Sequence, residues 1–225
     1  MTADAAFRPY VIAIFVVVMM IALPFRIKSQ STGEKLDRLQ EGLFILIALR
    51  LAGAVLWFSA LAFMINPAWM AWASLPFASW IRWAGVAIGA VTPFLLAWTL
   101  STLGPNLTDT VVTRQAHTLV TRGPYRWVRH PFYDCMALFV LSLGLIAANW
   151  FMLAAGIAVF ALLAARTRIE EEKLLARFGD SYRAYLERTG RFVPRLRAGP
   201  ANQASPATRA DARSTQESRA QTRKQ

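Results

Sequence analysis

The apolar residues of this 225-residue chain lie in long blocks, and most of its charges fall between the blocks. A helix needs about 20 mostly apolar residues to span a bilayer. Only helices and closed barrels satisfy their own backbone hydrogen bonds in lipid. We therefore expect an all-α polytopic membrane protein with about five transmembrane helices, three of which must borrow flanking residues. The blocks are residues 10–25, 42–65, 80–103, 132–148 and 150–165.

The first block could also be a secretory signal peptide. Such a peptide ends in a small-residue cleavage site, whereas this block is followed by Pro-Phe-Arg-Ile-Lys at residues 24–28. We therefore interpret it as an uncleaved first helix.

The charges between the blocks alternate in a way that predicts the orientation of the chain. Basic residues lie between blocks one and two, between blocks three and four, and after block five, while the other two connections are nearly neutral. Basic loops stay in the cytoplasm, so we expect the N-terminus outside and the C-terminus in the cytoplasm. The preference for Arg over Lys suggests a bacterial source, and so the bacterial inner membrane. Tryptophans near the neutral ends fit interfacial anchors: Trp69, Trp72, Trp80, Trp83 and Trp150.

The net charge of +12 does not require a nucleic-acid partner. Membrane topology and attraction to anionic membrane lipids account for it, so we expect no nucleic-acid binding. The single cysteine, Cys135, excludes an internal disulfide, and two histidines 13 residues apart disfavour a metal site.

Three regions follow from these patterns. Residues 1–103 form a transmembrane scaffold of three spans, residues 104–195 a core, and residues 196–225 a polar, basic tail that we expect to be disordered. Beyond block five the sequence becomes charged, but an apolar stripe at helical spacing continues to about Arg177. We therefore expect the last membrane helix to extend into the cytoplasm until Gly179 ends it.

Two polar clusters flank the hairpin of blocks four and five. The connection before block four, residues 117–133, contains both histidines of the chain, and Pro131 suits the first turn of a helix, which places His130 at its start. The second cluster follows block five, where Arg166 and Glu170 share a helix face. Each cluster alone could be a basic loop or a solvated helix surface. Together, on one side of one hairpin, they favour a ligand site.

The ordered set of pieces in residues 103–194 resembles the isoprenylcysteine carboxyl methyltransferase family, which is related to the phospholipid methyltransferases. The pieces are His-Thr-Leu-Val-Thr at 117–121, Gly-Pro-Tyr-Arg at 123–126, Arg-His-Pro-Phe-Tyr at 129–133, Glu-Glu at 170–171, Phe-Gly at 178–179, and Tyr182 with Tyr185.

The resemblance implies a membrane methyltransferase that uses S-adenosylmethionine, bound at the cytoplasmic mouth, and a lipidic or apolar methyl acceptor. Arg166 matches a position associated with the acceptor, which makes it the catalytic candidate. No metal is implied. The implied cofactor-binding residues are His117, Thr118, Leu119, Val120, Tyr125, His130, Pro131, Phe132, Tyr133 and Glu170.

Two departures from the family pattern and two rival functions remain open on the sequence alone. Cys135 replaces a small residue of the family, and Leu107 stands where relatives often have Trp. Membrane sterol and steroid reductases contain similar Arg-His-Pro pieces and would use NADPH. A non-enzymatic membrane protein on the same scaffold is the other alternative. The acceptor, the oligomeric state and the role of Arg50, an isolated charge within block two, stay open.

Overall fold

The computed structural model describes residues 3–30, 43–103 and 118–195. His117, Leu107 and the tail 196–225 lie outside these ranges, so the expectations for them stay untested. The described residues form six α-helices and two 3-10 helices and contain no β-strand. The elements are α1 (Ala3–Gln30), α2 (Leu43–Ile65), η2 (Pro67–Ala73), α3 (Ser79–Leu103), η4 (Gly123–Arg126), α4 (Pro131–Ala147), α5 (Trp150–Phe178) and α6 (Asp180–Arg188).

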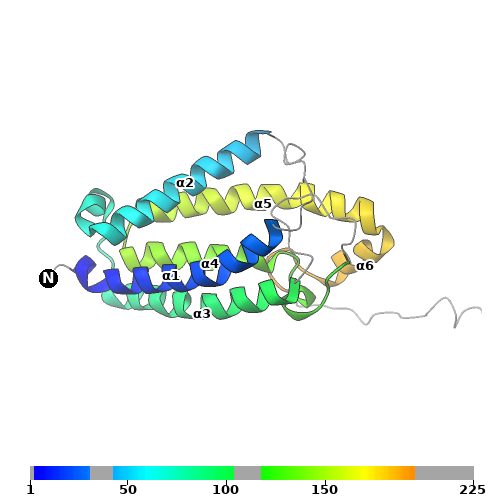
Figure 1. Cartoon of the computed structure of the whole chain (residues 1–225), viewed down its shortest axis with the longest axis horizontal. Helices are drawn as coiled ribbons and strands as arrows, with labels where there is room; N and C mark the ends of the chain where they lie inside the picture. Colours follow the sequence, from blue (N-terminus) through cyan, green and yellow to red (C-terminus); the bar gives the residue numbers. More distant parts are fainter. Residues whose placement is uncertain (1–2, 31–42, 104–117, 196–225) are drawn as a thin grey trace, which may run out of the picture. The chain divides into compact units, whose positions relative to one another are not determined.

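Helices α1 to α5 run back and forth between two ends of the bundle (Figure 1). Four of them, α1, α2, α3 and α5, are long and apolar enough to cross a membrane, and α4 is a shorter apolar helix of 17 residues. Seventeen residues lie at the lower limit for a span. The all-α polytopic architecture is thus confirmed, and the chain is a multi-pass integral membrane protein.

The last membrane helix extends as the sequence predicts. Helix α5 continues through its charged end to Phe178, and the Gly179 backbone N–H then donates to the Leu175 carbonyl. Gly179 has a positive φ of 53°, which glycine adopts without strain. Helix α1 is longer than its apolar block at both ends, because the segments with charged residues that flank the block are also helical.

The interior of the bundle lies between helices α1 to α5, where small residues allow close helix contact. A Cβ atom at Gly85 of α3 would lie 2.8 Å from the Cβ of Leu145 in α4. A Cβ atom at Gly156 of α5 would lie 2.0 Å from the Val140 side chain. Gly85 thus allows α3 to approach α4 closely, and Gly156 allows the close contact within the α4–α5 hairpin, which positions the site.

Hydrogen bonds connect the turn of the hairpin to the segment between α2 and α3. Asn149 caps α5 by accepting from the Met152 backbone N–H at 3.0 Å, and its amide donates to the Met70 carbonyl at 3.0 Å. Trp72 and Trp150 make an edge-to-face contact here, with ring centroids 5.7 Å apart. We call this the Trp-rich end of the bundle.

A partly buried ion pair lies at the same end. Arg82 of α3 is only 4% exposed, and its guanidinium lies 3.0 Å from the Asp4 carboxylate of α1. It also donates to the Ile146 carbonyl in the last turn of α4 at 2.8 Å and stacks on the Phe7 ring. Arg82 therefore joins three helices.

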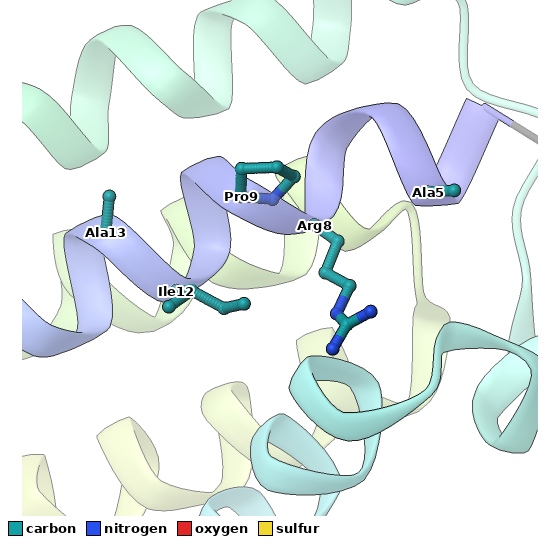
Figure 2. A pocket seen from close by; sticks show the side chains of 5 residues that line it. All are labelled: Ala5, Arg8, Pro9, Ile12 and Ala13. Atoms are coloured by element: carbon teal, nitrogen blue, oxygen red, sulfur yellow. The ribbon is translucent and has the colours of Figure 1, made fainter. Parts of the chain in front are cut away.

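A mostly apolar groove of about 360 Å³ runs along the first half of α1 (Figure 2). Arg8 is its charged residue, and its Nε donates to the Met64 carbonyl near the end of α2 at 2.6 Å. Figure 1 places this part of α1 at the end of the bundle opposite α6, so the groove is separate from the polar clusters described next. The lining residues are Ala5, Arg8, Pro9, Ile12 and Ala13.

Candidate functional site

The two polar clusters of the sequence meet at the end of the bundle that carries α6. One cluster comes from η4 and the start of α4, and the other from the charged end of α5. His130 is the N-cap residue of α4 and Pro131 is its first residue, as the sequence predicts. The described side chains therefore converge where α4 begins and where α5 leaves its apolar part.

A short segment after α6 completes this end of the bundle. Residues 189–192, which we call the C-terminal strap, run parallel to the backbone before α4, with a bridge between Val128 and Gly190. The Arg129 backbone N–H donates to the Gly190 carbonyl at 2.9 Å, and the His130 N–H to the Arg191 carbonyl at 3.2 Å. The strap thereby orients the N-cap of α4 through the main chain.

Glu171 is the centre of an ionic cluster. Its Oε1 accepts from Arg129 Nε at 2.8 Å and from Arg191 Nε at 3.2 Å, and it lies 3.2 Å from His130 Nε2. Its Oε2 accepts from Arg191 Nη2 at 2.5 Å. Arg129 also donates to the Thr189 carbonyl. With two guanidinium groups bonded to it, Glu171 has little capacity left for a ligand.

Glu170, on the neighbouring position of α5, has a different set of partners. Its Oε1 accepts from the Tyr133 hydroxyl at 2.5 Å and lies 3.4 Å from Arg166 Nε. Its Oε2 lies 3.4 Å from His130 Nδ1. Glu170 and Arg166 are only 17% and 11% exposed in their side chains. This pair is therefore partly buried and better suited to exchange partners with a polar ligand.

His130 touches both carboxylates, one with each ring nitrogen. Burial by itself disfavours the charged imidazolium and lowers the pKa of His130, but hydrogen bonds and charges from Glu170 and Glu171 outweigh this effect. The net result is a pKa above the ordinary value of 6.5. The Tyr133 ring stacks on the imidazole with centroids 5.5 Å apart, so the orientation of both rings is defined.

Helix α6 supports the loop that precedes α4. The hydroxyl of Tyr185 donates to the Tyr125 carbonyl at 2.6 Å, and the Tyr125 ring is buried. Burial raises the pKa of the Tyr182 hydroxyl, which has no hydrogen-bond partner among the residues that the structure describes. A buried donor without a partner is costly, so this hydroxyl could accept or donate to a ligand or a water.

The structure brings together His130, Tyr133, Glu170 and Arg166 from the predicted set, while Pro131 and Phe132 form the first turn of α4 beside them. The other predicted cofactor residues that the structure describes come earlier in the chain. Tyr125 lies in η4, and irregular chain ahead of it contains Thr118, Leu119 and Val120.

Sequence reasoning missed three residues of this cluster: Arg129, Glu171 and Arg191. The Glu-Glu pair was visible, but no pattern separates a carboxylate that binds a ligand from one that binds two arginines. Arg191 lies 20 residues from Glu171, and only the fold of α6 and the strap brings them together.

Three chemically different side chains meet at this end of the α4–α5 hairpin, which we call the mouth: the Glu170 carboxylate, the Arg166 guanidinium and the Tyr133 hydroxyl. Groups of these types bond to ammonium, carboxylate and hydroxyl groups of a ligand. No cluster of three or more potential metal ligands occurs in the described ranges.

Comparisons with known proteins find similar sequences and a similar fold. Residues 85–177 match the isoprenylcysteine carboxyl methyltransferase (ICMT) family. The chain is 35% identical over 123 residues to the cobalt-zinc-cadmium resistance protein CzcN of Cupriavidus metallidurans, covering 51% of this chain and 55% of that one. It is 29% identical over 133 residues to the protein-S-isoprenylcysteine O-methyltransferase of Dictyostelium discoideum, covering 56% of this chain and 55% of that enzyme.

A solved structure shows the same fold. It is that of the eukaryotic intramembrane Ras methyltransferase ICMT, with a TM-score of 0.51 and 22% sequence identity, covering 83% of this chain and 68% of that one. The chain spans about half the length of the curated relatives that it matches. The comparisons confirm the resemblance to the ICMT family and its fold.

Proposed function

We propose that this ICMT-like membrane protein transfers a methyl group from S-adenosylmethionine to a lipidic or apolar acceptor. One observation carries the proposal: His130 and Tyr133 of the α4 start and Arg166 and Glu170 of the α5 end meet at one mouth of a membrane hairpin. This hairpin lies within the segment that matches the family. In this proposal residues 1–103 act as scaffold, residues 104–195 as catalytic core, and residues 196–225 as a tail.

In this proposal Glu170, His130 and Tyr133 bind and orient the cofactor. S-adenosylmethionine supplies a methyl group on a sulfonium, which needs a nucleophile in line with it but no metal. Glu170 accepts hydrogen bonds from the ammonium or the ribose, because a carboxylate at the sulfonium would stabilise the ground state more than the transition state. His130 and Tyr133 hold Glu170 in place, and positioning in a dry site supplies much of the rate.

Arg166 is assigned to the acceptor. It lies one helical turn before Glu170, at the boundary between the apolar and charged parts of α5. Its guanidinium can hold a carboxylate or a polar head group in line with the methyl. A prenylcysteine carboxylate, a small thiol, a phospholipid amine and a quinone-like compound all suit this assignment, so O-, S- and N-methylation are alternatives that an assay must separate.

The rival NADPH-dependent reductase is not favoured. The 2′-phosphate of NADPH needs a cluster of uncommitted basic side chains, whereas Arg129 and Arg191 are bound to Glu171. Isothermal titration of the purified protein in detergent with S-adenosylmethionine and with NADPH separates the two functions. We expect saturable binding of the first and none of the second. Binding of NADPH alone would overturn the proposal.

The orientation belongs to the same proposal. A cytoplasmic mouth gives S-adenosylmethionine direct access, and the basic connections place that mouth inside if the positive-inside rule holds. Reporter fusions in a bacterial inner membrane should therefore read inside after Lys35, outside after Ala73 and inside after Arg195. A cytoplasmic signal at Ala73 would contradict the orientation.

A further inference from the structure

We propose that Arg191 is a positioning residue, which acts through Glu171 and the strap backbone to hold the His130 ring toward Glu170. This inference rests on the proposed function, because it concerns the site assigned to S-adenosylmethionine. Arg191 lies outside the segment that matches the family, residues 85–177. It is not placed in contact with the ligand.

Arg191 reaches His130 by two routes. Its backbone carbonyl accepts from the His130 N–H at 3.2 Å, which fixes the residue at the N-cap of α4. Its guanidinium makes a bidentate hydrogen bond to the Glu171 carboxylate, from Nε to Oε1 and from Nη2 to Oε2. Oε1 in turn lies 3.2 Å from His130 Nε2. A bidentate hydrogen bond defines the plane of the carboxylate, which a single point charge cannot do.

The result is a defined direction for the imidazole. With Nε2 held at Glu171, the other nitrogen, Nδ1, faces Glu170 at 3.4 Å. Phe192 of the strap also packs against the imidazole, with centroids 6.0 Å apart, and against Phe160 of α5 at 5.3 Å. The strap therefore contacts His130 through the Phe192 side chain as well as through its backbone.

The strap itself has little freedom to shift. A Cβ atom at Gly190 would lie 1.6 Å from the Val193 carbonyl oxygen, so any larger residue there must move the backbone. Because Gly190 also pairs with Trp127 and Arg129 through the main chain, such a change would move the N-cap of α4 as well.

The first test measures the titration of the His130 imidazole in the absence of any ligand. The chain has two histidines, so nitrogen NMR of labelled protein in detergent, with His117→Gln for assignment, follows the His130 titration. The groups that face the imidazole are Glu170 and Glu171 of α5, Asp134 of α4, and the two arginines of the cluster. We expect Arg191→Ala to shift the titration midpoint and Arg183→Ala, in an exposed pair with Asp180, to leave it unchanged. An unchanged midpoint in Arg191→Ala overturns the inference.

The second test is a double-mutant cycle on S-adenosylmethionine binding. Arg191→Ala should weaken binding about tenfold, the loss expected for one charge-assisted contact. In a His130→Ala background the same change should reduce the affinity for S-adenosylmethionine less than about twofold, because the imidazole that Arg191 positions is absent. Equal losses in both backgrounds would show that Arg191 acts elsewhere and would overturn the inference.

A further variant keeps the test valid if Arg191→Ala does not fold. Arg191→Lys retains the charge but not the bidentate hydrogen bond. We therefore expect a shifted titration midpoint of His130 and a reduced affinity for S-adenosylmethionine. Wild-type values for both quantities would overturn the inference. Failure of the proposed function looks different. In that case the wild-type protein itself would not bind S-adenosylmethionine, whatever the NMR titration shows.

Discussion

The hydroxyl of Tyr133 donates a hydrogen bond to Oε1 of Glu170 across 2.5 Å and so joins the first turn of α4 to the charged end of α5. These two residues are 37 positions apart in the sequence, one on each helix of the membrane hairpin. Because they come from the two polar clusters of the sequence, their hydrogen bond joins these clusters directly.

The first prediction tests Glu170 as a cofactor residue. Glu170→Gln keeps the size of the side chain but removes the charge, so S-adenosylmethionine binding should weaken by about 1–3 kcal/mol, the usual cost of losing a charged hydrogen-bond partner. Isothermal titration in detergent measures it. Glu172→Gln is the matched control, because Glu172 lies on the same helix but is exposed. Equal affinity in both variants would place the cofactor elsewhere.

A second prediction concerns pH. The pKa of folded His130 lies above 6.5, its ordinary value. The imidazolium therefore contributes stability that is fully present below pH 6.5 and is lost as the pH rises through the folded pKa. A tenfold difference in proton affinity between the folded and unfolded states is worth about 1.4 kcal/mol of unfolding free energy.

Thermal unfolding of the wild type and of His130→Asn in detergent, between pH 6 and pH 9, measures this contribution. The difference in unfolding free energy between the two should shrink with rising pH. A constant difference across this range would mean that His130 does not change its charge there.

A third prediction addresses stability at the Trp-rich end. Arg82→Ala removes a buried guanidinium that bonds to Asp4 and to the Ile146 carbonyl. We expect a loss of about 2–3 kcal/mol in unfolding free energy, somewhat below the cost for a fully buried pair, because the Asp4 side chain is 28% exposed. S-adenosylmethionine binding by the folded protein should remain, since the pair lies at the other end. Arg183→Ala, in an exposed pair, should cost almost nothing.

Most of the fold could be predicted because it depends on hydrophobic length. Blocks two and three match α2 and α3 to within about one residue at each end, and the extension of α5 to Phe178 follows from its apolar stripe. The limits of α1 could not be predicted this way, since charged residues such as Asp4, Arg8 and Arg26 interrupt the apolar pattern near both ends. The cap by Asn149 and its bond to Met70 depend on tertiary packing that no local pattern indicates.

The site could be predicted in part. His130 and Glu170 each belong to a polar cluster beside an apolar helix, and that pattern is visible in the sequence. The different bonding partners of Glu170 and Glu171 are not visible in the sequence. They depend on Arg191, which follows α6 in the chain and is brought next to Glu171 only by the fold. A helical sequence places adjacent residues about 100° apart, so two neighbouring carboxylates face different surroundings.

The last prediction separates the acceptor from the cofactor at Arg166. The Arg166 side chain is 11% exposed and its Nε lies 3.4 Å from Glu170 Oε1. If its guanidinium holds the acceptor, Arg166→Ala should leave S-adenosylmethionine affinity within about threefold but slow methyl transfer by about 100-fold or more, since orientation supplies much of the rate. Arg166→Lys should rescue poorly, because Lys keeps the charge but lacks the planar pair of donors.

The competing role for Arg166 is that of a lipid anchor that extends to phosphate head groups. Lys serves that role equally well, so full activity in Arg166→Lys would remove Arg166 from the site. Arg168→Ala is the matched control, since Arg168 lies two residues after Arg166 on the same helix and is exposed. Methyl transfer to each candidate acceptor, measured with purified variants in lipid nanodiscs, gives kcat and KM separately. A rise in acceptor KM with an unchanged kcat would assign Arg166 to binding alone, whereas a fall in kcat assigns it to alignment of the acceptor with the methyl group.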